Sequence, residues 1–190
     1  RRQRQMCIRD STYNNTVLDC NNSLFNGSGS YQGSNDPKGV IIDSLWHSGS
    51  VGVLNNTQVR NCQFDGLVYG VHIGINEPAT VVMENVTVKN SKYGVYINKD
   101  YNNLDLSSFT LENNTYGLYV FKRTGDLIID DFNISESTFY GIYLGSYAHD
   151  VTIKNSYVYN NGNATYPAIK IEGTSNLLYN NKVYNNDVKI

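Results

Sequence analysis

The stretch YGVYI at residues 93–97 recurs along the chain with small changes. Its relatives are KGVII (38–42), YGVHI (69–73), YGLYV (116–120), YGIYL (140–144) and PAIKI (167–171). The glycine, or the alanine of the last copy, lies at positions 39, 70, 94, 117, 141 and 168, so the spacing settles to 23 or 24 residues through the middle of the chain. A period of this length is typical of proteins in which one structural unit is stacked on the next.

A second apolar pattern lies about 12 residues before the glycine of each later copy. Its members are Val59-x-x-Cys62-x-Phe64, Met83-x-x-Val86-x-Val88, Leu106-x-x-Phe109-x-Leu111, Ile129-x-x-Phe132-x-Ile134, Ile153-x-x-Ser156-x-Val158 and Leu178-x-x-Asn181-x-Val183. Alternation with a period of two indicates strands, and each run is too short for a helix. Each period therefore contains short strands joined by bends rich in Asn, Ser and Gly.

Such a unit cannot bury its apolar face alone, whereas stacking like residues on like residues buries it. The stack predicts two inward columns on the strand that begins with glycine. They contain Val71, Val95, Leu118, Ile142 and Ile169, and beside them Ile73, Ile97, Val120, Leu144 and Ile171. The repeat is therefore predicted to be a scaffold.

A polar column supports the same alignment of the repeats. It consists of Asn61, Asn85, Ser108, Asp131, Asn155 and Asn180, each at a point where a strand has to bend sharply. Asn and Asp tolerate the left-handed backbone conformation and form hydrogen bonds with neighbouring backbone groups. We expect these side chains to satisfy the bend in coil after coil rather than to form a functional site.

The period, the strand that begins with glycine and the asparagine column resemble the right-handed parallel β-helix repeat. CIRDSTYNNTVLDCNN (7–22) followed by GVIIDS (39–44) is similar to the opening coil of NosD-like, carbohydrate-associated β-helix proteins. The resemblance covers almost the whole chain and implies an all-β fold, a single-stranded right-handed parallel β-helix of roughly seven coils. Because this architecture carries polysaccharide lyases, glycoside hydrolases, tailspikes, adhesins and surface-layer proteins, the resemblance predicts the fold and not the activity.

Composition is consistent with one domain over residues 1–190, since 40% of the residues are apolar and nothing resembles a linker. The 15 Lys and Arg nearly balance the 17 Asp and Glu, and no nucleic-acid partner is expected. The N-terminal arginines at positions 1, 2, 4 and 9 fit a solvated tail better than a polyanion site. No apolar run is long enough for a membrane span. The sequence opens without a secretion signal, so any signal has been removed or lies outside it.

The sequence contains no recognisable catalytic pattern. Asp130 and Asp131 are adjacent, but neighbouring strand residues point to opposite faces, and Asp131 belongs to the bend column. The Gly-His-Gly and Arg-x-Lys segments of β-helix polygalacturonases are not found, nor is the acidic cluster of the calcium-dependent pectate lyases. His47, His72 and His149 have no metal-ligand spacing, and His72 is expected to lie on the outer surface. We therefore predict no cofactor and no metal, and the balance is against an enzyme.

The chain has three cysteines. Cys62 occupies an inward position and is predicted to be a small core residue. Cys7 and Cys20 both belong to the first coil, where they either pair as a disulfide in an extracellular protein or remain two buried thiols.

Potential N-glycosylation sequons are more frequent than this composition would give by chance. The candidates for surface glycans are Asn14, Asn21, Asn26, Asn55, Asn113, Asn133 and Asn163. Asn85 also begins a sequon but lies in the bend column, where a glycan would disrupt stacking. These sequons favour an extracellular or cell-surface location.

Tyrosines recur on the outer side of the strand that begins with glycine. Tyr96, Tyr119 and Tyr143 follow the glycine by two residues and are predicted to form an exposed column that binds glycans or other surface proteins. The alternative is that tyrosine stacking only stabilises the solenoid.

The last residues, NDVKI (186–190), resemble the next PAIKI strand, with Val188 and Ile190 in the inward columns. We therefore expect either a longer stack or end-to-end self-association of subunits. Together these observations predict an extracellular structural β-helix protein of a cell surface, sheath, fibre or filament, glycosylated and able to bind glycans. The alternative is a carbohydrate-active enzyme or a tailspike-type adhesin whose site lies outside the recognisable motifs.

Overall fold

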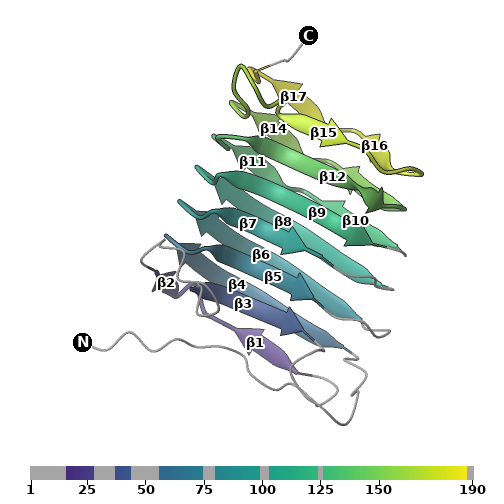
Figure 1. Cartoon of the computed structure of the whole chain (residues 1–190). Coiled ribbons are helices and arrows are strands. Elements are labelled where there is room, and N and C mark those ends of the chain that lie inside the picture. Colours follow the sequence, from purple (N-terminus) through teal and green to yellow (C-terminus); the bar gives the residue numbers. More distant parts are fainter. Residues whose placement is uncertain are drawn as a thin grey trace.

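The computed structural model describes residues 16–27, 37–43, 56–74, 80–98, 103–123 and 126–187. Within these ranges every regular element is a β-strand, and the strands form two sheets. The strands lie one above another from the N-terminal to the C-terminal end of the molecule, so neighbours in the stack are about one repeat apart in sequence (Figure 1).

Sheet A has eleven strands and sheet B has six. Sheet A contains β1 (Val17–Asp19), β2 (Leu24–Asn26), β4 (Thr57–Asp65), β6 (Val81–Lys89), β8 (Leu104–Glu112), β10 (Leu127–Asp130), β11 (Asn133–Ser135), β13 (Val151–Lys154), β14 (Tyr157–Tyr159), β16 (Leu177–Tyr179) and β17 (Lys182–Tyr184). Sheet B contains β3 (Lys38–Asp43), β5 (Tyr69–Gly74), β7 (Tyr93–Ile97), β9 (Tyr116–Arg123), β12 (Tyr140–Ala148) and β15 (Ile169–Ile171).

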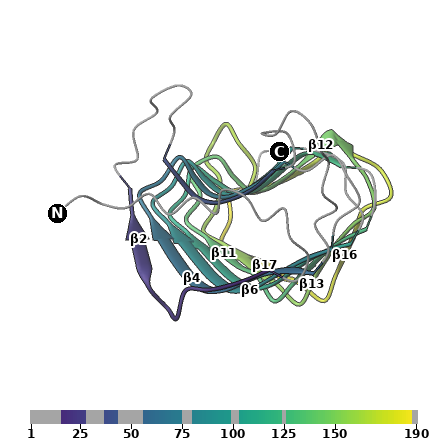
Figure 2. The same cartoon turned by 90° about the horizontal axis from the view of Figure 1, so that it is seen from below.

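All strand pairs within the two sheets are parallel, and each joins one coil to the next. Viewed along the stack, the two sheets face each other across the interior (Figure 2). The predicted all-β parallel solenoid is confirmed. The number of coils was overestimated, because about five full turns are present, with short strands in the partial turns at both ends of the described chain.

The predicted inward columns form the core except in the last coil, where Ile169 is only partly buried and Ile171 is 43% exposed. Val71 is aligned with Val95, Val95 with Leu118, and Leu118 with Ile142, and these side chains are fully buried. The facing strands of sheet A contribute the second apolar pattern, including the stacked rings of Phe109 and Phe132, whose centroids are 4.6 Å apart. One continuous apolar cluster therefore runs through the stack.

The predicted bend column is also confirmed. Its six residues all have a left-handed backbone, with φ between 52° and 58°: Asn61, Asn85, Ser108, Asp131, Asn155 and Asn180. The side chains connect neighbouring coils, since the Asn85 amide nitrogen donates to the side-chain oxygen of Asn61 over 2.7 Å. The column thus provides both the bend and hydrogen bonds along the stack.

A second bend column, five residues further along each coil, was not predicted. It contains Gly66, Asn90, Asn113, Glu136, Asn160 and Asn185, all with positive φ. The residue that follows each of these bend positions points inward. After Gly66 this residue is Leu67, and in the later coils it is Ser or Asn. The side-chain oxygen of Asn114 accepts from the backbone nitrogen of Ser91, and that of Asn161 accepts from the backbone nitrogen of Ser137, each over 2.9 Å. These buried groups supply hydrogen bonds to corner amides that have no strand partner.

The glycine in second position of five sheet B strands, which Ala168 replaces beside the last strand β15, has a steric reason. A Cβ atom built on Gly117 would lie 2.6 Å from the carbonyl oxygen of Gly141 and 2.7 Å from Cγ2 of Ile134. Gly94 meets the carbonyl oxygen of Gly117 in the same way, at 2.6 Å. The close approach of consecutive coils at this position therefore excludes a side chain.

The structure corrects the predicted cysteine pairing. Cys20 forms a disulfide with Cys62, and their Cα atoms are 4.9 Å apart. Cys62 does lie in the core, but it is cross-linked to the first coil and does not carry a free thiol. The two cysteines meet because Cys20 follows β1, and the next coil places Cys62 directly beside it. Cys7 lies outside the described residues, as do Val188 and Ile190.

Replacing Gly117 by alanine should test the close approach of the coils. We expect Gly117→Ala to lower the free energy of unfolding by about 1–3 kcal/mol, because the new methyl group meets backbone that has little room to move. Ser146→Ala in β12, at an exposed position, is the control and should change stability by less than about 0.5 kcal/mol. Chemical denaturation followed by circular dichroism measures both, and equal stabilities would contradict this account of the glycine column.

The disulfide should contribute strongly to stability because it closes a segment of 42 residues. In the chain-entropy model such a loop is worth roughly 4 kcal/mol. We expect Cys20→Ser with Cys62→Ser to lower the melting temperature markedly, and a reducing agent to do the same to the parent protein. Peptide mapping without reduction should recover a peptide that joins Cys20 and Cys62, whereas a peptide that joins Cys7 to Cys20 would contradict the structure.

Candidate functional site

The outer surface of sheet B carries a continuous group of aromatic rings, which we call the aromatic face. It consists of His72 and seven tyrosines: Tyr69, Tyr93, Tyr96, Tyr116, Tyr119, Tyr140 and Tyr143. These residues form two columns, because each of β5, β7, β9 and β12 contributes its first residue and the residue three positions later. The Tyr-Gly-x-Tyr or Tyr-Gly-x-His sequence at the start of these strands therefore supplies both columns.

The rings contact one another within and between the columns. In the first column the ring centroids of Tyr69 and Tyr93 are 5.1 Å apart and those of Tyr93 and Tyr116 are 4.9 Å apart, with nearly parallel planes. In the second column the closest pair is Tyr119 and Tyr143, at 4.5 Å. Pairs across the columns, such as Tyr93 with Tyr96 at 5.0 Å, join the two columns into one surface.

The prediction of an exposed tyrosine column is only partly right. Tyr96, Tyr119 and Tyr143 do lie on the outer surface of sheet B, in register from coil to coil, but each is half-buried. The neighbouring column covers one side of these rings, and this contact was not foreseen from the sequence. His72 likewise lies on the outer surface, but its ring packs on Tyr69 and Tyr96 and is not freely exposed. Mutual packing therefore makes the aromatic face part of the fold as well as part of the surface.

Further groups extend the aromatic face at its borders. Phe139 and Tyr166 stack on each other at 4.4 Å and contact Tyr116 and Tyr140, respectively, edge-on. Lysine ammonium groups lie over three of the rings: Lys38 over Tyr69 at 5.6 Å, Lys92 over Tyr93 at 5.4 Å and Lys170 over Tyr143 at 5.7 Å. The border of the aromatic face is thus cationic.

One polar cluster lies at the C-terminal end of this surface. The Tyr143 hydroxyl donates to Oε2 of Glu172 over 2.7 Å, and Lys170 Nζ lies 2.6 Å from Oε1 of the same carboxylate. Two hydrogen bonds lower the pKa of Glu172. The one from Lys170 has the larger effect, and the one from Tyr143 adds to it. Glu172 is therefore a charged carboxylate held by two neighbours.

Burial governs the protonation of the tyrosines. It raises the pKa of Tyr93, Tyr96, Tyr116, Tyr119 and Tyr143 above the usual value for a phenol. Nearby phenols add to this effect at Tyr93, and the hydrogen bond to Glu172 adds to it at Tyr143. These five tyrosines therefore keep their hydroxyl protons to a higher pH than a free phenol does, which suits uncharged hydrogen-bonding ligands.

The candidate glycosylation sites fall into distinct environments. Asn21, Asn26 and Asn113 are exposed, whereas Asn133 and Asn163 are half-buried. Asn113 belongs to the second bend column and donates to the side-chain oxygen of Asn90 over 2.7 Å. A glycan on Asn113 would therefore disrupt stacking, as expected for Asn85. Asn14 and Asn55 lie outside the described residues. Whether any of these sequons carries a glycan stays a prediction.

The acidic pair singled out in the sequence has structural partners. Asp130 binds Lys154, with 3.2 Å between Nζ and Oδ2, and accepts a hydrogen bond from Asn155. Asp131 accepts a hydrogen bond from the Ser108 hydroxyl over 3.0 Å. Across the described ranges no group of His, Cys, Asp or Glu side chains is arranged to hold a metal ion. The part of the chain that the structure describes contains no helix that could cross a membrane.

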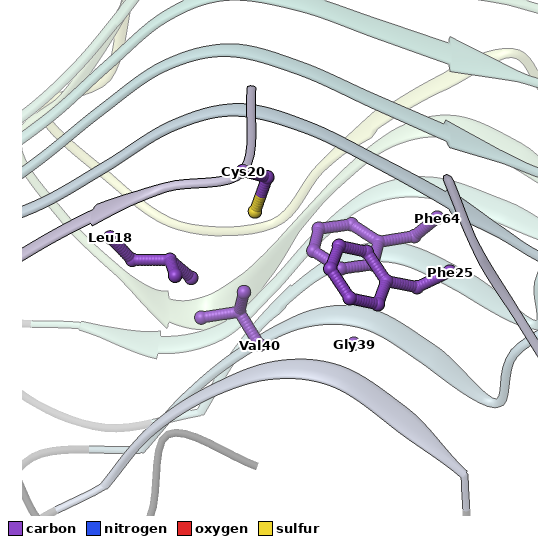
Figure 3. Close-up of a pocket in the computed structure, with 6 residues that line it drawn as sticks. All are labelled: Leu18, Cys20, Phe25, Gly39, Val40 and Phe64. Carbon is purple, nitrogen blue, oxygen red and sulfur yellow. The ribbon is translucent and has the colours of Figure 1, made fainter. Parts of the chain in front are cut away.

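A small apolar cavity lies at the N-terminal end of the core, away from the aromatic face. Its lining consists of Leu18, Cys20, Phe25, Gly39, Val40 and Phe64 (Figure 3). The rings of Phe25 and Phe64 stack at 5.6 Å, and no charged side chain lines the cavity.

The sequence did not show that the column of Tyr69, Tyr93, Tyr116 and Tyr140 would contact the column of Tyr96, Tyr119 and Tyr143. Sequence reasoning also missed Glu172, Phe139 and Tyr166. Phe139 and Tyr166 occupy the same position in two successive coils, three residues before the aligned Ile142 and Ile169. The signal was weak because the two preceding coils have Lys92 and Thr115 at this position.

The parallel strands, the stacked side chains and the regular bends define the chain as a solenoid protein built from β-coils. The family model described as the right handed beta helix region matches residues 44–190, so the chain belongs to the right-handed β-helix family. No match was found among curated proteins or among solved structures. The family establishes the fold and leaves the function to be argued from the surface.

The raised tyrosine pKa values predict loss of stability in alkali. The unfolded chain ionises its tyrosines near pH 10, whereas the folded protein keeps these protons to higher pH, so the stability contribution present below pH 10 is lost as the pH rises further. Melting temperatures between pH 8 and pH 11 should therefore fall steeply above pH 10. Tyr93→Phe with Tyr143→Phe should flatten this fall.

The matched control for this experiment is Tyr147→Phe, because Tyr147 belongs to the same strand as Tyr143 but is 59% exposed and lies outside the aromatic face. It should leave the dependence on pH unchanged. An equal flattening by Tyr147→Phe, or none by the double variant, would contradict the proposed role of burial.

Proposed function

We propose that the protein is an extracellular structural component of a cell surface or sheath whose aromatic face binds glycans. The observation that carries this proposal is the aromatic face itself, a surface of eight rings in contact, held on a rigid sheet with neutral hydroxyl groups. Aromatic rings provide large contact areas at low entropic cost, and their hydroxyl groups provide hydrogen bonds for orientation. Sugar rings offer apolar faces and hydroxyl groups that match both.

Two further observations support an extracellular location. Disulfides such as Cys20–Cys62 form and persist mainly in oxidising compartments. The exposed sequon asparagines at positions 21 and 26 belong to the same first coil as Cys20. A stack of paired strands that is cross-linked at one end suits a structural role outside the cell.

The direction of the two columns suggests how a glycan would bind. Coils repeat about every 4.8 Å along the stack, so the aromatic face is longest along the axis of the solenoid. A linear polysaccharide chain lying along this axis would contact tyrosines from several coils at once. Affinity would then increase with the length of the chain, because each additional sugar reaches another ring.

Replacing Tyr96, Tyr119 and Tyr143 together by serine should test this proposal. We expect binding to a panel of soluble oligosaccharides and insoluble polysaccharides to be lost, because the three tyrosines of the second column are removed. The melting temperature should also fall, since each ring contacts neighbours in the aromatic face. Binding must therefore be measured at a temperature where the variant is folded, as judged by circular dichroism.

Two controls separate binding from stability. Replacing the same three tyrosines by phenylalanine keeps the ring contacts, so this variant should remain stable and lose only the part of binding that depends on hydroxyl groups. Replacing Tyr157, Tyr179 and Tyr184 by serine removes three exposed tyrosines from sheet A and should leave binding unchanged. Full binding by the folded sheet B serine variant, or no binding by the parent protein, would refute the role in glycan recognition.

A further inference from the structure

Two tyrosine rings stack on each other on sheet A, the sheet that does not carry the aromatic face. Tyr159 is the last residue of β14 and Tyr184 is the last residue of β17, and the parallel pairing of these strands aligns the two residues (Figure 1). Their ring centroids are 5.1 Å apart, and the planes of the rings differ by 3°. Because the residues are one repeat apart in sequence, the contact joins one coil to the next.

Asparagine side chains hold β17 in register with β14 at both of its ends. Before the strand, the side-chain oxygen of Asn181 accepts a hydrogen bond from the backbone nitrogen of Ser156 over 2.9 Å. After the strand, the side-chain oxygen of Asn186 accepts from the backbone nitrogen of Asn161 over 2.9 Å, and its amide nitrogen donates to the carbonyl oxygen of Val158 over 2.8 Å. The backbone of the second tyrosine lies between these two anchors and is therefore held opposite the first.

Solvent reaches this pair more readily than it reaches the aromatic face. Tyr184 is 46% exposed, whereas every tyrosine of the aromatic face is half-buried, as Tyr159 is. Within the described ranges each of the two rings has the other as its one aromatic neighbour. By contrast, Tyr93 in the aromatic face lies between Tyr69 and Tyr116. A dissolved reagent can therefore approach the pair on sheet A, and fewer neighbouring rings restrict a small movement of its side chains.

Neighbouring phenols can be joined by oxidation. A one-electron oxidant takes an electron from a phenol, and the hydroxyl proton passes to water, which leaves a phenoxyl radical with unpaired spin on the carbons ortho to the oxygen. When two such radicals meet, a carbon–carbon bond forms between one ortho carbon of each ring, and the hydrogen on each of these carbons then moves to the phenol oxygen. In total, two phenols lose two electrons and two protons, and one hydrogen peroxide takes them up to form two water molecules.

The stacked arrangement favours coupling inside the pair. Radicals on different molecules have to meet by diffusion, whereas these rings are already in contact on strands that hold their backbones at the spacing of neighbouring coils. A small shift of one ring is enough to bring an ortho carbon of each together. Tyr157 on the same strand provides a contrast, because it is 40% exposed but is aligned with Lys182 and not with a tyrosine.

We propose that Tyr159 and Tyr184 form a site of oxidative modification, at which a one-electron oxidant of the haem peroxidase class, supplied with hydrogen peroxide, joins the two rings as dityrosine. The bond ties β17 to β14 and so holds the last described coil, as the Cys20–Cys62 disulfide holds the first. Both cross-links form under oxidising conditions, such as those outside the cell. The inference goes beyond the proposed function and does not depend on it, because it concerns the opposite sheet and requires no glycan.

A dityrosine at this place should stabilise the fold. In the chain-entropy model a cross-link restricts the unfolded chain, and a closed loop of one repeat is long enough for a clear effect. We expect the melting temperature of the cross-linked protein to rise by about 5–10 °C, as for a disulfide of similar loop length in a chain of this size.

Treatment of the full chain with a haem peroxidase and hydrogen peroxide tests the proposal. The reaction is run in dilute solution, and the monomer is then isolated by gel filtration, so that cross-links between molecules are removed. The monomer should show dityrosine fluorescence, and its digest should contain two peptides joined through Tyr159 and Tyr184 that together weigh two hydrogens less than the separate peptides. Melting curves before and after treatment give the change in stability.

Two conservative variants show where the bond forms. Tyr184→Phe removes the phenol but keeps the ring, so the fold should persist while the dityrosine fluorescence of the monomer falls about tenfold. Tyr157→Phe removes an exposed phenol from the same strand as Tyr159 and should leave both the cross-link and the rise in melting temperature unchanged.

The outcomes separate the proposed site from general oxidation. A treated parent without the linked peptides, or a Tyr184→Phe monomer with the parent's dityrosine fluorescence, would overturn the proposal. Cross-links confined to the aromatic face would do the same, since they would show that burial there does not protect the phenols. A linked protein that melts at the temperature of the untreated parent would overturn the role of the bond in holding the coil.

Discussion

The fold depends on one constraint: each coil must hydrogen-bond to the coil below it in parallel register, at the spacing of neighbouring strands. Under this constraint a residue meets its own counterpart from the next repeat and not a different partner. Val95 lies on Leu118, Tyr93 on Tyr116 and the glycines on one another. A repeated sequence is therefore the chemical consequence of repeated contact, since every position must tolerate a copy of itself.

The same constraint explains how much could be predicted from the sequence. The apolar columns and the first bend column are repeated at nearly every coil, so their register follows from the period. The second bend column varies from Gly66 to Glu136, and a mixed column gives little signal even though the backbone is the same. The Cys20–Cys62 disulfide could not be derived from spacing, because it depends on how the irregular first coil lies on the second.

For the candidate site, sequence periodicity placed the tyrosines on the outer surface but did not show their environment. Each position was predicted from its own column, whereas burial of the rings arises between columns, as in the 5.0 Å contact of Tyr93 with Tyr96. Such contacts depend on side-chain direction near a bend, where a tyrosine at the edge turns towards the middle of the sheet. The aromatic face can consequently serve both as part of the scaffold and as a binding surface, because the ring contacts that stabilise the coils also hold the face flat.

Residues on the outer surface can differ from coil to coil more freely than residues in the core. Inward positions within the strands are mostly apolar and the inward corner positions mostly Ser or Asn, but an outward position can change its charge, provided that like charges do not stack directly on each other. Sheet A accordingly alternates Arg60, Glu84 and Ser107 along one outward column, with Asp130 and Lys154 further on. Sheet B instead repeats aromatic residues and places its lysines at the border. This difference between the faces is not required by the fold, and it is therefore where the interactions of the protein with its surroundings should be encoded.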